Sequence, residues 1–182
     1  AALGVRLMPL LTHRVVVDML AEHGVGYLDC GVSGGVWGLE NGYGLMVGGE
    51  AGEVARVMPI FDALRPDGPR DEGFVHAGAV GAGHYAKMVH NGIEYGLMQA
   101  YAEGWELLEA SGEVTNVPEV FKSWREGTVI RSWLLDLMVR ALDADPHLDG
   151  IEGYAADSGE GRWTVNAAVE LGVPVPTMAA AL

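Results

Sequence analysis

The stretch that organises this sequence is Gly81-Ala82-Gly83-His84-Tyr85-Ala86-Lys87-Met88-Val89-His90-Asn91-Gly92-Ile93-Glu94-Tyr95-Gly96-Leu97-Met98. A helix turns by about 100° per residue, so it would place five polar side chains within an arc of roughly 140°. These are Lys87, His90, Asn91, Glu94 and Tyr95. The arc combines an amine, an imidazole, an amide, a carboxyl group and a phenol. The pattern therefore predicts a helix that carries a chemical site on one face.

A solvated helix face is the alternative interpretation, because surface helices usually keep their polar residues on the side that faces water. Two features favour a site. Met98 lies within the polar arc, and Gly92 and Gly96 each cost a helix about 1 kcal/mol relative to alanine. The two glycines predict that another backbone packs closely against this helix.

The composition indicates a globular protein with a sizeable core. The chain has 182 residues, of which 49% are hydrophobic. Its 25 acidic and 11 basic side chains leave a formal charge of −14, and the sequence pI is about 4.6. We therefore expect neither nucleic acid nor an anionic membrane surface as a partner. An anionic substrate would need a local cluster of the few basic groups.

The single cysteine, Cys30, cannot form an intrachain disulfide, so we expect a reducing, cytoplasmic location. We also expect no signal peptide and no transmembrane segment, because no apolar run reaches membrane length. The six histidines show no metal-ligand spacing, and we expect no metal.

Up to residue 79 the sequence alternates between strand and helix patterns. Residues 10–23 have helical periodicity, and Gly24 stands where a helix-ending glycine belongs. Short apolar runs bounded by glycines predict strands. We expect strands over 25–30, 43–47 and 73–76 and a helix over 53–64, while residues 1–9 form either a strand or a disordered leader. This alternation is typical of an α/β layer.

A glycine-rich turn follows the first predicted strand. Its sequence, Gly31-Val32-Ser33-Gly34-Gly35, is flexible enough to bring backbone N–H groups against a ligand. A plain connecting turn is the alternative.

The sequence after Gly81 is helical. We expect helices over 84–111, 117–125, 129–142 and 164–171, with a domain boundary near Ala79. The segment Gly81–Ala86 matches the glycine fingerprint of dinucleotide-binding folds. That fingerprint requires a short helix that returns to a second strand, whereas this helix runs past residue 103. We therefore reject the match.

With these residues in view, the chain resembles the 6-phosphogluconate dehydrogenases (decarboxylating) of the shorter bacterial type, within the β-hydroxyacid dehydrogenase superfamily. The similarity covers nearly all of residues 22–182. Its most specific segment is Lys87–Gly96, supported by Val32–Gly35 and by Gly159–Thr164. Three motifs in the right order make chance an unconvincing explanation.

The resemblance implies a fold of the α/β plus all-α class. Residues 1–79 would form a partial Rossmann-like dinucleotide-binding layer, the C-terminal part of an NAD(P)-binding domain. Residues 80–182 would form a mainly helical 6-phosphogluconate dehydrogenase C-terminal-like domain that binds substrate and dimerises. A homodimer is the implied oligomer.

The implied reaction is the oxidation of 6-phosphogluconate, a phosphorylated sugar acid, with NAD or NADP, followed by loss of carbon dioxide to give ribulose 5-phosphate. This step belongs to gluconate metabolism and the pentose phosphate pathway. The resemblance makes Lys87 the general base, which must be neutral to accept the hydroxyl proton. Glu94 would protonate the enediol carbon left after decarboxylation. His90 and Asn91 would hydrogen-bond to substrate oxygens.

The remaining implied contacts bind the two ends of the substrate. Ser33, Gly34 and Gly35 would hold the carboxylate end near the nicotinamide, and Tyr95, Arg162 and Thr164 would contact the phosphate. The family commonly has lysine in place of Arg162, and arginine can bind a phosphate through two N–H groups. Without the resemblance, each of these residues has an ordinary structural explanation as a solvated charge or a satisfied polar group.

The sequence departs from the family at its ends. The N-terminal glycine fingerprint for the cofactor pyrophosphate is absent, and the sequence stops at Leu182, before the later helix that normally provides another phosphate-binding arginine in the family. Val36 stands on the cofactor side, where many longer relatives have an acidic residue, and it leaves NAD or NADP open. Two hypotheses follow: an enzyme, or a catalytically silent fragment or pseudoenzyme that acts as an oligomerisation or regulatory module.

Overall fold

The computed structural model describes residues 10–182, with side chains from residue 15 onward. The expectation for residues 1–9 lies outside this range. The chain divides into two compact units, one ending at Asn91 and one running from Gly92 to Leu182. Helix α5, Ala82–Ser111, contributes residues to both units, and each unit is described by itself.

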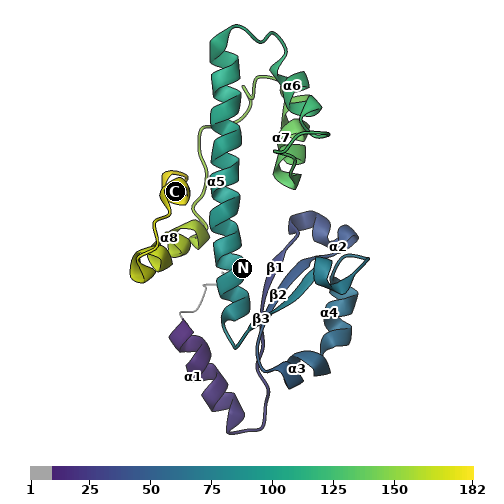
Figure 1. Cartoon of the computed structure of the whole chain (residues 1–182), viewed down its shortest axis with the longest axis vertical. Helices are drawn as coiled ribbons and strands as arrows, with labels where there is room; N and C mark the ends of the chain where they lie inside the picture. Colours follow the sequence, from purple (N-terminus) through teal and green to yellow (C-terminus); the bar gives the residue numbers. More distant parts are fainter. Residues whose placement is uncertain (1–9) are drawn as a thin grey trace. The chain divides into compact units, whose positions relative to one another are not determined.

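A small mixed sheet forms the centre of the first unit (Figure 1). Within the described residues it contains β1 (Asp29–Ser33), β2 (Gly44–Gly48) and β3 (Phe74–Gly78), in the order β1-β2-β3. Strand β2 runs antiparallel to β1 and parallel to β3. The strands predicted over 43–47 and 73–76 are confirmed within two residues.

The strand predicted over 25–30 is wrong in position, because β1 begins at Asp29 and extends through Ser33. The N–H group of Val25 donates to the carbonyl of Leu20 at 3.0 Å, and Gly24 has a φ of +66°. This is the geometry that closes a helix C-terminus. The residues directly after α1 (Leu10–Ala21) therefore end that helix, and β1 starts only after them.

Two short helices replace the single helix predicted over 53–64. They are α3 (Ala51–Arg56) and α4 (Met58–Leu64), which meet at Val57. Pro59 lies in the first turn of α4, and its missing N–H group cannot continue the hydrogen bonding of α3. The side chains of Val54 and Phe61 are buried with Leu45 and Val47 of β2, forming the core of this unit.

The connection from β1 to β2 is also helical. It contains a 3₁₀ turn, η1 (Gly35–Trp37), followed by the single turn α2 (Gly38–Asn41). A second 3₁₀ turn, η2 (Arg70–Glu72), precedes β3.

The second unit is helical, which confirms the predicted fold class of an α/β part followed by a mainly helical part. After α5 come α6 (Val117–Ser123), α7 (Trp133–Ala144), α8 (Glu160–Leu171) and α9 (Pro176–Ala180). Its core lies between α6 and α7, which are neighbours in Figure 1. The buried side chains there are Val117, Phe121, Leu135, Val139 and Leu142.

Capping residues set where the helices of the second unit begin. Ser132 accepts a hydrogen bond at Oγ from the N–H group of Leu135 at 3.1 Å, so α7 starts at Trp133 rather than at the predicted residue 129. Asn116 accepts one at Oδ1 from Glu119 in the same way. Helix α8 starts at Glu160, four residues before its predicted start, and α9 was not predicted.

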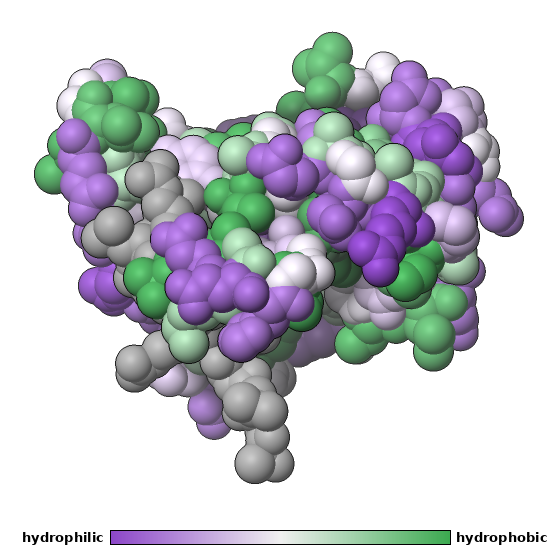
Figure 2. Space-filling view, turned by 90° about the horizontal axis from the view of Figure 1, so that it is seen from below, coloured by the Kyte–Doolittle hydropathy of each residue, from purple (hydrophilic) through white to green (hydrophobic). Residues whose placement is uncertain are grey.

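The surface mixes apolar and polar residues, as the face drawn in Figure 2 shows. Several large apolar side chains of the second unit are exposed: Leu107, Tyr154, Val169 and Leu171. Among the helices described here, none has the length and apolar character needed to cross a membrane.

Candidate functional site

Helix α5 is anchored at its N-terminus by a buried carboxylate on β1. The Asp29 side chain, 2% exposed, accepts hydrogen bonds from the N–H groups of Gly81 at 2.5 Å and His84 at 2.8 Å. A Cβ atom added to Gly48 or Gly83 would lie 2.3 or 2.9 Å from this carboxylate. The two glycines therefore make room for Asp29, and Asp29 fixes the start of α5 against the sheet.

Lys87 lies in the second turn of α5, where the helix touches β1. A Cβ atom added to Gly31 would stand 2.4 Å from the Cβ atom of Lys87 and 2.6 Å from the carbonyl oxygen of Gly83. Only glycine allows the strand backbone to come this close to the helix. This contact fixes the distance between Lys87 and the backbone of β1.

The polar side chains beyond that contact form one hydrogen-bonded cluster. The Lys87 amine donates to the amide oxygen of Asn91 and lies 3.5 Å from Nδ1 of His90. Nδ1 of His90 is 3.0 Å from the same amide oxygen, and its Nε2 is 3.3 Å from the Ser33 hydroxyl. A proton on Nδ1 lets His90 donate to Asn91 and accept from Ser33. The structure thus brings together Ser33, Lys87, His90 and Asn91.

The turn after Ser33 has backbone geometry that requires glycine. Gly34 has a φ of +148° and Gly35 a φ of +56°, both in the region that side chains disfavour. Val36 follows with a side chain that is 82% exposed. The turn therefore presents its backbone and one apolar side chain to solvent at the end of β1.

The predicted phosphate contacts lie in the second unit, where α8 packs on α5. Arg162 donates from Nε and Nη2 to one carboxylate oxygen of Asp157, at 2.9 and 2.6 Å. The Tyr95 hydroxyl lies 2.7 Å from the hydroxyl of Ser158. The structure therefore places Tyr95 and Arg162 beside the same short segment, Asp157-Ser158.

Thr164 and Glu94 complete this group of predicted residues. Thr164 is buried and donates its hydroxyl proton to the carbonyl of Glu160 at 3.0 Å. Its methyl group packs on α5, since a Cβ atom added to Gly92 would lie 2.6 Å from it. The close neighbours of Gly92 are therefore the side chains of Thr164 and Met178, rather than the backbone that was predicted to approach here. Glu94 is half-buried on α5, directly before Tyr95.

The arginine also determines the charge state of its partner. The Arg162 guanidinium, together with the N–H group of Gly159, lowers the pKa of Asp157 below its ordinary value. Asp157 is thus held as a carboxylate, and the pair is close to neutral overall.

Sequence reasoning missed three residues of these groups: Asp29, Asp157 and Ser158. Asp29 lies within the strand predicted over 25–30, and only the helix start at Gly81-Ala82-Gly83 could have suggested that an acid caps it. Asp157 and Ser158 directly precede the Gly159–Thr164 motif, and an acid five residues before an arginine carries no periodic signal.

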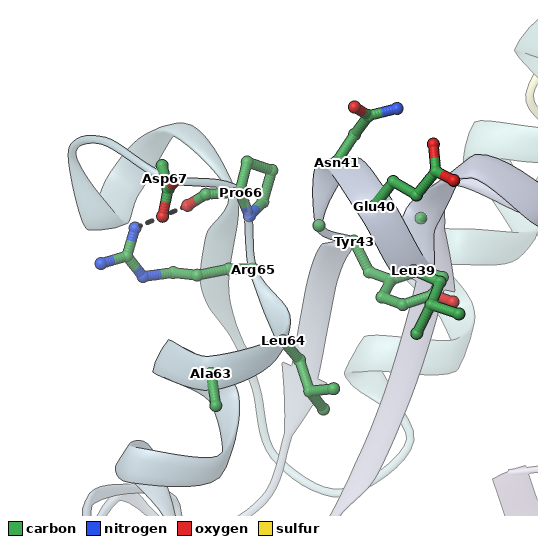
Figure 3. A pocket seen from close by; sticks show the side chains of 11 residues that line it. Leu39, Glu40, Asn41, Tyr43, Ala63, Leu64, Arg65, Pro66 and Asp67 are labelled. Atoms are coloured by element: carbon green, nitrogen blue, oxygen red, sulfur yellow. Dashed lines mark hydrogen bonds between the residues drawn. The ribbon is translucent and has the colours of Figure 1, made fainter.

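A separate cavity of about 520 Å³ opens in the first unit between α2 and the end of α4 (Figure 3). Its lining includes Glu40, Tyr43 and Arg65, and the predicted site residues stand outside it. The Arg65 guanidinium donates to the carbonyls of Pro66 and Gly68 and to Asp62. Because the Arg65 guanidinium already forms these hydrogen bonds within the fold, we assign this cavity no role.

No group of three or more His, Cys, Asp or Glu side chains in the part of the chain that the structure describes could hold a metal ion.

Comparison with known proteins identifies the class first. Residues 9–66 match the family model of the NAD binding domain of 6-phosphogluconate dehydrogenase. Residues 83–182, more than half of the chain, match the model of the 6-phosphogluconate dehydrogenase C-terminal domain. The chain therefore belongs to the 6-phosphogluconate dehydrogenase family, as its motifs predicted.

Individual relatives agree with this assignment. The chain is 48% identical over 151 residues to the NAD(+)-dependent, decarboxylating 6-phosphogluconate dehydrogenase of Haloferax volcanii, covering 82% of this chain and 50% of that protein. It is 39% identical over 184 residues to the decarboxylating enzyme of Synechocystis, covering 94% of this chain and 38% of that one. The chain thus spans half or less of the length of these relatives.

Solved structures give the same result. Plasmodium falciparum 6-phosphogluconate dehydrogenase, solved in its apo form and in complexes with NADP+ and with 6-phosphogluconate, matches with a TM-score of 0.83 and 32% identity over 97% of this chain and 39% of that one. A 3-hydroxyisobutyrate dehydrogenase of Mycobacterium tuberculosis matches with a TM-score of 0.70 at 24% identity, covering 94% of this chain and 58% of that one, and shows the fold alone.

Proposed function

We propose that this chain belongs to an enzyme that converts 6-phosphogluconate to ribulose 5-phosphate by oxidative decarboxylation, with reduction of NAD or NADP. The observation that carries the proposal is the hydrogen-bonded cluster of Lys87, His90, Asn91 and Ser33. The names of the relatives support it, as does the structural neighbour with 6-phosphogluconate in its title. The activity is proposed for the whole protein.

Lys87 is the proposed base in the oxidation step. Its amine takes the proton of the substrate hydroxyl as that carbon is oxidised to a ketone, and returns the proton to the ketone oxygen as carbon dioxide leaves. The cluster suits a group that alternates between two forms. The Asn91 amide oxygen accepts a hydrogen bond from the ammonium ion, and Nδ1 of His90, at 3.5 Å, can donate one to the neutral amine.

The neighbours of Lys87 have the proposed role of orienting substrate. His90 and Asn91 hydrogen-bond to substrate oxygens, and Ser33 with the Gly34-Gly35 backbone holds the carboxylate end. Glu94 supplies the proton that the enediol carbon needs after decarboxylation.

Tyr95, Arg162 and Thr164 are the proposed phosphate contacts. Arg162 and Tyr95 end in groups that solvent can reach, and a guanidinium can bind two phosphate oxygens at once. Thr164 is buried and its hydroxyl proton is engaged by Glu160, so we expect Arg162 and Tyr95 to meet the phosphate first.

The turn at the end of β1 has the chemistry to hold the nicotinamide end of a cofactor. Gly34 and Gly35 expose backbone groups, and Val36 offers an apolar surface to a flat ring. NAD or NADP, when bound, accepts the hydride that leaves the substrate carbon. The Haloferax relative is named NAD(+)-dependent and the Plasmodium structure was solved with NADP+. We therefore propose either NAD or NADP as the cofactor.

The domain roles follow from the same proposal. Residues 1–79 form the last part of an NAD(P)-binding domain, and residues 80–182 bind substrate and form a homodimer. Exposed apolar side chains of the second unit, such as Leu107 and Val169, support self-association. The single Cys30 is consistent with the cytoplasm.

Isothermal titration tests the proposal. The chain is titrated with 6-phosphogluconate, with gluconate as the control that lacks phosphate, and then with NAD and NADP, while reduced cofactor is followed by absorbance. We expect tighter binding of 6-phosphogluconate than of gluconate. Binding without turnover would favour the silent oligomerisation or regulatory module, and no preference between the two sugar acids would overturn the proposed substrate.

A further inference from the structure

The proposed phosphate contacts are occupied by the chain's own side chains. Two N–H groups of Arg162 point at one oxygen of Asp157, at 2.9 and 2.6 Å. The Tyr95 hydroxyl lies 2.7 Å from the Ser158 hydroxyl. One dipeptide in the segment before α8 therefore contacts both groups that would otherwise meet a phosphate.

This dipeptide is held in place by local bonds. The second carboxylate oxygen of Asp157 accepts a hydrogen bond from the N–H group of Gly159 at 2.7 Å. Gly159 has a φ of +94°, which turns the backbone into α8. The Cβ that Gly161 lacks would lie 2.6 Å from the Tyr95 ring, so the tyrosine lies directly against the first turn of α8. The Asp157 carboxylate thus contacts Arg162 of α8, and the Ser158 hydroxyl contacts Tyr95 of α5.

We propose that Asp157 is an internal competitor of the substrate phosphate, which must displace its carboxylate from Arg162 to bind. The proposal rests on the proposed function, because it takes Arg162 and Tyr95 as the phosphate contacts. Asp157 then sets how tightly Arg162 can bind a phosphate. A phosphate dianion carries more charge and more acceptor oxygens than a carboxylate, so it can replace Asp157, whereas a sugar acid without phosphate has no group that competes with Asp157 for Arg162.

The exposure of the pair makes such an exchange feasible. The side chains of Arg162 and Asp157 are 58% and 37% exposed. Ion pairs at this exposure contribute little net stability, because water screens the charges in the bound and separated states alike. The Asp157 carboxylate therefore lowers the affinity of Arg162 for an anion, but a phosphate can still displace it.

Titration of four single variants and one double variant tests the inference. Asp157→Asn removes the competing charge at nearly the same size, and Asp157→Ser repeats the test with a different side chain. Asp149→Asn is the matched control, because it removes one negative charge from an exposed position of the same loop. Arg162→Gln removes the proposed phosphate contact. Each is titrated with 6-phosphogluconate, gluconate and inorganic phosphate, and circular dichroism verifies the fold.

We expect Asp157→Asn and Asp157→Ser to bind 6-phosphogluconate and inorganic phosphate about fivefold more tightly than wild type, the change that loss of one exposed ion pair allows. Their gluconate affinity and the phosphate affinity of Asp149→Asn should stay unchanged. Adding Arg162→Gln to Asp157→Asn should abolish the gain.

Two results would overturn the inference in distinguishable ways. Weaker or unchanged phosphate binding in both Asp157 variants, with weaker binding in Arg162→Gln, would show that Asp157 merely orients the arginine, and the proposed function would stand. Unchanged phosphate binding in Arg162→Gln would remove Arg162 from the phosphate site and would overturn that part of the proposed function as well.

Discussion

Gly31 and Lys87 are in direct contact, with no room for a side chain on the glycine. A Cβ atom added to Gly31 would stand 2.4 Å from the Cβ atom of Lys87, a distance that real side chains do not adopt. Its other close neighbour is backbone, the carbonyl oxygen of Gly83, which cannot move aside alone. The position of the proposed base therefore depends on the absence of one methyl group on β1.

Gly31→Ala should push α5 away from β1. We expect a loss of roughly 1–3 kcal/mol in the free energy of unfolding, the usual cost of overpacking, together with a fall in turnover. Urea denaturation measures the first effect. Gly52→Ala is the matched control, because Gly52 lies in α3 and an added Cβ meets nothing within 4 Å. Equal stability of the Gly31 and Gly52 variants would contradict the close contact.

Lys87→Met tests the proposed base. Methionine keeps much of the apolar stem and removes the amine, so we expect the fold to survive while turnover of 6-phosphogluconate falls by about 10²–10⁴-fold. The sequence offers a matched control in its other lysine, Lys122, which is exposed on α6 beside Glu119. Lys122→Met should leave turnover unchanged. Retained activity in Lys87→Met would exclude the lysine as the base.

Asp29 is expected to stabilise the fold strongly, because it accepts hydrogen bonds from two backbone N–H groups at the start of α5. Asp29→Ala leaves the N–H groups of Gly81 and His84 buried without an acceptor, which should cost roughly 2–4 kcal/mol of unfolding free energy. Hydrogen exchange should accelerate at the amides of Gly81 and His84 in particular. Asp67→Asn, an exposed carboxyl in a loop, serves as the control. A stability change no larger than the control's would mean that water replaces the carboxylate.

How much of the site was predictable depends on how far apart in sequence its members lie. Lys87, His90 and Asn91 share one helix, and helical periodicity alone predicts that they share a face. Ser33 lies 57 residues before His90, and only the family resemblance suggested that they belong together. Asp157 meets Arg162 across a turn rather than along a helix, and no repeating pattern predicts such a contact.

The errors in the predicted fold have equally local causes. The early strand was misplaced because residues 25–28 are apolar, whereas the bond from Val25 to Leu20 uses this segment to end α1. A single helix over 53–64 does not form, because Pro59 has no N–H group to donate to a carbonyl of the preceding turn. Apolar periodicity located the elements, but backbone hydrogen bonds decided their ends.

Asp62 on α4 forms ion pairs with Arg65 and Arg70, and these pairs predict how the stability of the fold changes in acid. Hydrogen bonds from Arg70 and Arg65 lower the pKa of Asp62 below its ordinary value. Because the folded pKa is the lower one, the carboxylate stabilises the fold above its unfolded pKa of about 3.9, and this contribution is lost as pH falls through the folded value. Asp62→Asn should lower the thermal midpoint at pH 7. The gap to wild type should close on acidification below about pH 4. A gap independent of pH would show that packing rather than charge is responsible.

Gly92 and Thr164 provide a test by compensation. A Cβ atom added to Gly92 would lie 2.6 Å from the Thr164 methyl carbon and 3.1 Å from the Met178 sulfur. Gly92→Ala should therefore loosen α8 from α5 and cost roughly 1–3 kcal/mol of unfolding free energy. Thr164→Ser removes the obstructing methyl group and keeps the hydroxyl that donates to Glu160.

The double variant should recover part of that loss, because serine leaves space for the new methyl group. Denaturant unfolding of the wild type, both single variants and the double variant forms a cycle that isolates the coupling between the two positions. Gly104→Ala on α5 is the control, since an added Cβ there meets nothing within 4 Å and alanine favours the helix. Additive effects in the cycle would mean that the Thr164 methyl group is not what requires glycine at position 92.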